Sequence, residues 1–169
     1  MGFLLPAAII VLLDQSTKQL FWYLGKNFDL IDGLLKITLV RNSGAVFGMF
    51  PGGRTFFIIG SIVASAVIVA VGMGTPKTRP WKRLALGLIL GGAVGNLIDR
   101  LFFGEVIDFV DMGIGLHRWP VYNVADIAVT LGAIGLVFSF LRSDHQTDPA
   151  SPVPAVTGNS EPPGERDGG

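Results

Sequence analysis

The sequence contains no cysteine among its 169 residues. Disulfide bonds, thiol nucleophiles and cysteine-ligated metal sites are therefore excluded. Histidine is almost as scarce, because the chain has only His117 and His145, and neither lies in an HExxH motif or another metal-binding spacing. We therefore expect an activity that uses no metal ion and no other cofactor.

Charged residues are also few. They make up only 15% of the chain, and 13 basic residues balance 13 acidic ones. A neutral chain without a basic stripe of interleaved aromatic residues argues against nucleic-acid binding. Half of the residues are hydrophobic and the mean hydropathy is +0.55. This composition is too apolar for a water-soluble domain of this size and predicts a membrane protein.

Long apolar runs predict a mainly α-helical bundle of four transmembrane helices. The clearest run, residues 56–73, contains no charged side chain. It approaches the roughly 20 residues that a hydrocarbon core of about 30 Å requires. The remaining spans are predicted at residues 3–24, 84–103 and 121–141.

The first of these segments is the least regular, because its apolar start is followed by Asp14, Gln15, Lys18 and Gln19. A cleaved signal peptide is the alternative interpretation of residues 3–24. No basic residue precedes the apolar run and three more spans follow, which favours a transmembrane helix. Asp14 and Lys18 are four residues apart, so we expect them to form an ion pair on one helical face.

The orientation follows from the loop at residues 74–83, which carries four basic residues and is therefore predicted to be cytoplasmic. Both termini then lie in the cytoplasm, and residues 25–54 and 104–120 lie outside. Residues 34–41 are typical of a strand, followed by turn residues, which predicts a small extracytoplasmic β layer. The next apolar run, 45–50, either pairs back, dips into lipid or forms an interfacial loop.

Two further features concern packing and domain limits. Gly87, Gly91 and Gly95 line one helical face at four-residue spacing, which allows a neighbouring helix to approach closely. After residue 142 the composition becomes rich in proline and glycine. We therefore expect a membrane domain at residues 1–142 and a disordered cytoplasmic tail at 143–169.

Four acidic residues gather near the outer ends of the last two spans: Asp99, Asp108, Asp111 and Asp126. Asp108 and Asp126 can reach a similar depth. Two close carboxyl groups do not both ionise readily, so the pair can act as general acid and general base around one water. The alternative is that these acids are interfacial residues paired with Arg100 or Arg118.

Five ordered motifs make the sequence similar to one family. Across residues 10–141 the chain resembles the bacterial lipoprotein signal peptidases, also called signal peptidase II. The segments that carry the resemblance are Asp14 to Lys18 (DQSTK), Arg41 to Gly48 (RNSGAVFG), Gly91 to Arg100 (GGAVGNLIDR), Val106 to Phe109 (VIDF) and Tyr122 to Asp126 (YNVAD).

The resemblance implies an intramembrane aspartic endopeptidase of the bacterial inner membrane. Such an enzyme removes the signal peptide from a prolipoprotein by cutting before a cysteine that already carries a diacylglyceryl group. The implied catalytic residues are Asp108 and Asp126. The implied substrate-binding or supporting residues are Asp14, Lys18, Asn42, Gly92, Asn96, Asp99, Arg100, Asn123 and Ala125. The expected partners are the prolipoprotein and membrane lipid, and the expected state is a monomer.

Two other functions remain open from the residues alone. In a small proton-coupled transporter, Asp14, Lys18, Asp108 and Asp126 would form a proton relay. A structural membrane subunit without a site of its own would leave the polar motifs unexplained. A peptidase works in detergent without a gradient, whereas a transporter requires a sealed vesicle.

Overall fold

The computed structural model describes residues 2–44 and 53–143; for residues 142 and 143 it describes the backbone alone. The apolar run predicted at residues 45–50 therefore lies outside the described residues. So does the tail from residue 144 onward.

The described chain is mainly helical. Its helices are α1 (Leu4–Leu24), α2 (Arg54–Gly74), α3 (Pro80–Phe102) and α4 (Val124–Ser143). Among the described residues, three helices are long and apolar enough to cross a membrane, namely α2, α3 and the segment Val124–Leu141. α1 has the same length as α2, but the polar residues in its second half lower its hydropathy.

Two helices begin at other residues than the spans predicted from the sequence. α3 begins at Pro80 rather than at residue 84, because proline at the first helical position has a backbone angle suited to a helix and loses no hydrogen bond there. α4 begins at Val124 rather than at residue 121, because Asn123 caps the helix.

α3 lies at the centre and contacts each of the other helices. Its glycines make this possible. A Cβ atom at Gly91 would lie 2.7 Å from the carbonyl oxygen of Ala7 in α1, and one at Gly95 would lie 2.6 Å from Asp14 Oδ2. The predicted close approach along the glycine face is therefore confirmed. Gly92 is turned toward α4, where its Cβ would collide with the carbonyl oxygen of Ala125.

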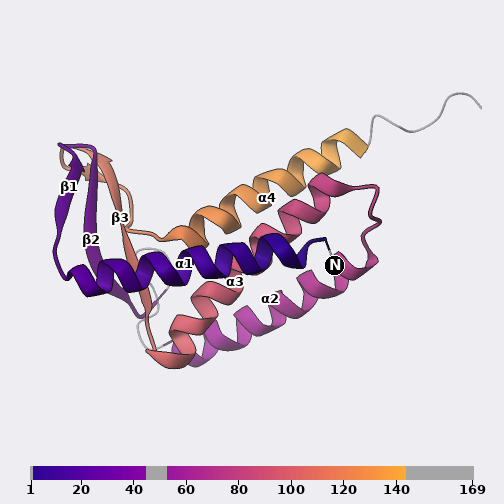
Figure 1. Ribbon diagram of the computed structural model, residues 1–169, viewed down its shortest axis with the longest axis horizontal. Coiled ribbons are helices and arrows are strands. Elements are labelled where there is room, and N and C mark those ends of the chain that lie inside the picture. Colours follow the sequence, from indigo (N-terminus) through magenta and orange to yellow (C-terminus); the bar gives the residue numbers. More distant parts are fainter. Residues whose placement is uncertain (1, 45–52, 144–169) are drawn as a thin grey trace, which may run out of the picture.

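A small antiparallel sheet lies at one end of the bundle (Figure 1). Its strands, in spatial order, are β1 (Phe28–Ile31), β2 (Leu35–Asn42), β3 (Val106–Ile114) and β4 (His117–Arg118). The predicted strand at residues 34–41 is confirmed as β2. Residues 104–120, which were predicted to lie outside the membrane, contain β3, and this strand was not predicted from the sequence. The N-terminal end of α1 and the C-terminal end of α4 lie at the opposite end (Figure 1).

The pairing of β2 with β3 brings two motifs of the sequence together. Val40 lies opposite Asp108, and Arg41 lies opposite Ile107. Successive residues of a strand point to opposite faces of the sheet. The side chains of Asp108 and Ile107 therefore point to opposite faces of the sheet. The polar groups on these two faces belong to two separate regions of the protein.

Candidate active site

The site begins at the first turn of α4, where two side chains cap the helix reciprocally. Asn123 Oδ1 accepts a hydrogen bond of 3.0 Å from the backbone N–H of Asp126, and Asp126 Oδ2 accepts one of 3.2 Å from the backbone N–H of Asn123. This is the geometry of a capping box, which satisfies N–H groups that have no partner within the helix. The orientation of Asp126 is therefore fixed by the start of its own helix.

The side-chain amide of Asn123 connects this helix end to β3. Its Nδ2 donates to Asp108 Oδ1 at 2.7 Å and to Asn96 Oδ1 of α3 at 3.0 Å. Asn96 in turn donates from Nδ2 to Asp126 Oδ1 at 2.8 Å. One fully buried asparagine thus contacts both Asp108 and Asp126.

Asp108 lies in the less solvated of the two positions, because only 2% of its surface is exposed, whereas Asp126 is half-buried. Asn42 Nδ2 donates to the second oxygen of Asp108 at 3.0 Å. Burial raises the pKa of the Asp108 carboxyl from 3.8 to about 7, and the charge of Asp126 raises it as well; the hydrogen bonds from Asn42 and Asn123 oppose the rise. Near neutral pH, Asp108 therefore holds its proton in a large fraction of molecules.

A buried ion cluster supports the network from α1. Lys18 Nζ lies 2.7 Å from Asp14 Oδ2 and 2.8 Å from Asp99 Oδ2, and all three side chains are almost completely buried. The predicted ion pair of Asp14 and Lys18 is therefore confirmed. Lys18 also donates to Asn96 Oδ1 at 3.1 Å. Because Asn96 Oδ1 accepts from Lys18, its Nδ2 is turned toward Asp126.

Asp14 has a second contact that fixes α4. Its Oδ1 accepts a hydrogen bond of 3.0 Å from the backbone N–H of Ala125, in the first turn of α4. A carboxylate at a helix N-terminus satisfies a free N–H and interacts favourably with the helix dipole. The absence of a side chain at Gly92 and Gly95 allows α4 and Asp14 to come this close to α3.

Arg100 lies beside the network, one turn after Asn96. Its guanidinium group stacks over the ring of Phe57 at 5.1 Å, and it donates to the carbonyl oxygens of Asn96 and Gly44 at 3.4 Å. Among the described residues, no carboxylate lies within ion-pair distance of Arg100. Its charge nevertheless interacts at longer range with those of Asp126 and Asp108.

Asp111 is separated from this arrangement, although the sequence analysis grouped it with the other acids. Its carboxylate lies 2.8 Å from Arg118 and accepts a hydrogen bond of 3.2 Å from Thr38. Three positions along a strand change the face, so Asp111 and Asp108 point in opposite directions. For Asp111, the alternative of an acid paired with Arg118 is therefore correct.

Two further residues that contact α3 near the site were not proposed from the sequence. Gln15 donates from Nε2 to Asp99 Oδ1 at 2.9 Å and to the carbonyl oxygen of Gly95 at 3.2 Å. Arg54 donates to the carbonyl oxygens of Arg100 and Leu101 at the end of α3. A polar glutamine in an apolar helix indicated that Gln15 has a polar partner. Nothing in the sequence distinguished Arg54 from the other basic residues of the segments predicted to lie outside.

The chain also matches a known protein family. The family model described as signal peptidase (SPase) II matches residues 6–142. A lipoprotein signal peptidase of Syntrophus aciditrophicus is 37% identical over 153 residues, covering 85% of this chain and 94% of that protein. A lipoprotein signal peptidase of Geobacillus kaustophilus is 44% identical over 135 residues, covering 76% of this chain and 85% of that protein.

Solved structures show the same fold. One bacterial membrane enzyme, whose structure was obtained by the in meso method, has a TM-score of 0.80 to this chain at 33% identity and covers 88% of it and 93% of its own length. A second, also described as a bacterial membrane enzyme, has a TM-score of 0.74 at 35% identity. The chain belongs to the signal peptidase II family, the aspartic lipoprotein signal peptidases of bacteria, which remove signal peptides from prolipoproteins.

Proposed function

We propose that this enzyme cleaves diacylglyceryl-modified prolipoproteins immediately before the lipidated cysteine, with Asp108 and Asp126 as its catalytic pair. The observation that carries the proposal is the side-chain amide of Asn123, which donates to Asp108, while its oxygen and backbone N–H hold Asp126. Two carboxyl groups held by one buried residue can activate a single water molecule from two sides.

The different surroundings of the two acids suggest their roles. Asp108 is the buried group whose pKa is raised to about 7, so it serves as the neutral acid. Asp126 is the more solvated group and serves as the base. It takes a proton from water as the water oxygen attacks the scissile carbonyl carbon, and Asp108 gives its proton to the carbonyl oxygen. As the tetrahedral intermediate collapses and the C–N bond breaks, Asp126 gives its proton to the leaving amine and Asp108 takes one back from a hydroxyl of the gem-diol, so both acids return to their starting states.

Other residues hold this pair or face the substrate. We assign Asn42 and Arg100 to the substrate side, because Arg100 has no ion-pair partner among the described residues and Asn42 contacts Asp108 from the end of β2. The supporting residues are those that fix α1, α3 and α4 against one another: Asp14, Lys18, Gly92, Asn96, Asp99, Asn123 and Ala125.

We further propose four spans, with α1 as the first, and both termini in the cytoplasm. The ion pairs and hydrogen bonds of Asp14 and Lys18 support this, since they lower the cost of burying these charges at membrane depth. The sheet and the site then lie near the outer face of the inner membrane. A cysteine introduced at Lys36 tests this, because the native chain has none. Labelling of that cysteine only from the cytoplasmic side contradicts the orientation.

Residues 1–142 form the proposed peptidase domain, acting as a monomer in contact with membrane lipid. Every residue assigned to catalysis or support lies within them. Truncation after Ser143 should leave proteolysis nearly unchanged. A truncated protein that inserts normally but no longer cleaves contradicts this domain boundary.

The cleavage reaction itself tests the proposal. Purified enzyme in detergent is given one prolipoprotein in two forms, with and without the diacylglyceryl group. We expect cleavage before the lipidated cysteine of the modified form only, and without any ion gradient. Equal cleavage of both forms, or cleavage at another bond, contradicts the proposed specificity.

A further inference from the structure

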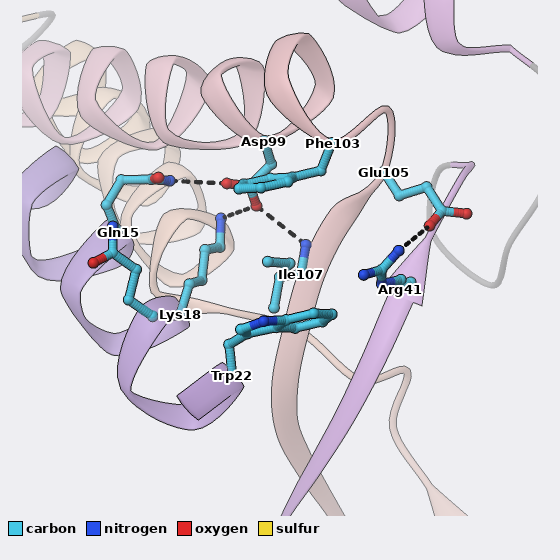
Figure 2. A pocket seen from close by; sticks show the side chains of 9 residues that line it. Gln15, Lys18, Trp22, Arg41, Asp99, Phe103, Glu105 and Ile107 are labelled. Carbon is cyan, nitrogen blue, oxygen red and sulfur yellow. Dashed lines mark hydrogen bonds and ion pairs between the residues drawn. The ribbon is translucent and has the colours of Figure 1, made fainter. Parts of the chain in front are cut away.

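A second polar region lies behind the proposed catalytic pair, in a cavity of about 250 Å³ between the sheet-side ends of α1 and α3 and the adjoining ends of β2 and β3. Figure 2 shows it from close by. Trp22, Phe103 and Ile107 form apolar parts of its wall, and Arg41 and Glu105 lie together at one side. The cavity therefore combines apolar walls with charges of both signs.

This cavity is separate from the proposed catalytic pair. Ile107 lines it, whereas the next residue, Asp108, points to the other face of β3. Arg41 lies opposite Ile107 in the sheet, and its neighbour Asn42 contacts Asp108. A molecule in the cavity would therefore lie behind the sheet and would not touch the proposed pair.

The inner polar groups of the cavity already have partners. Asp99 accepts hydrogen bonds from Gln15 at 2.9 Å and from the backbone N–H of Ile107 at 3.1 Å, and it pairs with Lys18 at 2.8 Å (Figure 2). Little capacity remains there for a ligand. The polar groups left to recognise one are those of Arg41, Glu105 and Gln19, of which only Arg41 and Glu105 are charged.

Arg41 and Glu105 form only a loose pair. Their closest atoms are 3.8 Å apart, beyond hydrogen-bond distance, and 54% and 35% of their side-chain surfaces are exposed. The guanidinium group of Arg41 stacks over Trp22 at 4.5 Å, which holds it at the wall of the cavity. A cation and an anion side by side, each without a hydrogen bond to the other, can receive a ligand that carries both charges.

We propose that this cavity binds the headgroup of a zwitterionic glycerophospholipid that carries a phosphate and a primary ammonium group. The phosphate lies against Arg41, which can donate two parallel hydrogen bonds to it, and the ammonium group lies against Glu105. The acyl chains pass along the exposed apolar surface beside Trp22 and Phe103. Tryptophan is enriched at the headgroup level of membranes, which agrees with a lipid at this position.

The charge pattern also selects against anionic lipids. A headgroup with a phosphate and no ammonium group would pair with Arg41 but leave Glu105 beside a second negative charge. A hydrogen-bonded contact with a charged group changes affinity by about tenfold or more. We therefore expect phosphatidylethanolamine to be retained on the order of tenfold more than phosphatidylglycerol.

Native mass spectrometry of the full-length enzyme tests this. The protein is equilibrated in detergent with equal amounts of the two lipids, and the retained lipids are counted. Arg41→Gln should lower retention of both lipids by about tenfold. Glu105→Gln should bring the two lipids to similar retention, because it removes the ammonium partner and the repulsion together.

A second exposed ion pair of the sheet provides the matched control. Lys36 and Asp29 lie 3.3 Å apart with 41% and 42% of their side-chain surfaces exposed, and neither lines the cavity. Lys36→Gln and Asp29→Asn should leave retention and preference unchanged. Equal retention of both lipids by the unmodified enzyme, or the same loss in the control variants, overturns the proposal. Because no prolipoprotein is present, the result is independent of the proposed cleavage reaction.

Discussion

The pH dependence of cleavage should depend on Asn42, because this residue supplies a hydrogen bond that favours the ionised form of Asp108. Asn42 Nδ2 lies 3.0 Å from Asp108 Oδ2. Burial raises the pKa of Asp108 to about 7, and the Asn42 hydrogen bond opposes that rise. If Asp108 must be protonated, kcat/KM declines as pH rises through this pKa. Asn42→Ala removes the opposing contact, so the alkaline decline should move to higher pH.

The size of the movement follows from the lost hydrogen bond. A hydrogen bond to a charged group contributes about 1.5–3 kcal/mol. One pKa unit corresponds to about 1.4 kcal/mol, so complete loss raises the pKa of Asp108 by about one to two units. Asn42 is only half-buried, so water will enter its place and recover part of the stabilisation. We therefore expect a movement of about one unit, at the lower end of that range.

The assay is kcat/KM for a diacylglyceryl-modified prolipoprotein, measured between pH 5 and 9. Asp111→Asn is the matched control, because Asp111 lies on the same strand but pairs with Arg118. The control should keep the alkaline decline at its original pH. An unchanged decline in Asn42→Ala, or one that moves to lower pH, refutes the assigned protonation state of Asp108.

Two further predictions concern the packing that supports the site. Lys18→Met leaves the buried carboxylates of Asp14 and Asp99 without their cation, so it should lower the free energy of unfolding by about 3–5 kcal/mol. Unfolding by denaturant measures this, and an unchanged midpoint contradicts the role of the cluster. Gly92→Val places a side chain against the α4 backbone, which should cost about 1–3 kcal/mol and lower kcat/KM. Gly60→Val is its control, because nothing lies within 4 Å of that Cβ position; equal effects of the two variants refute the close approach of α3 and α4.

Hydropathy predicted the helices well because each apolar helix must have a length suited to the bilayer. Their ends were less predictable, since local capping decides them. The first turn of α4 is an example. Asn123 precedes the helix rather than forming part of it, because its side chain caps the N–H of Asp126.

β3 was missed because its sequence does not alternate cleanly between apolar and polar residues. Asp108 is as buried as its neighbours Ile107 and Phe109, since hydrogen bonds from two asparagines satisfy the oxygens of its carboxyl group. Without the strand, only the family resemblance separated Asp108 from Asp111, and the pattern of polar and apolar residues did not. Recognition of β3 would have done so, because residues three apart on a strand face opposite sides.

Contacts between distant segments were beyond sequence reasoning. Asp14 caps the N–H of Ala125, which is 111 residues further along the chain. The pairing of Asp14 with Lys18 was predictable, because residues four apart share a helical face. The addition of Asp99 to that pair depends on how α1 packs against α3, which a single sequence does not specify.

The most direct test of the central claim compares turnover of three variants with that of the unmodified enzyme. Asp108→Asn and Asp126→Asn keep the shape of each side chain but cannot exchange a proton in the same way. Each should lower kcat by at least about 10²–10⁴-fold while the protein still inserts and binds its substrate. Asp111→Asn should retain near-normal turnover. Near-normal turnover in either of the first two variants, or inactivity of Asp111→Asn alone, would contradict the assignment of the catalytic pair.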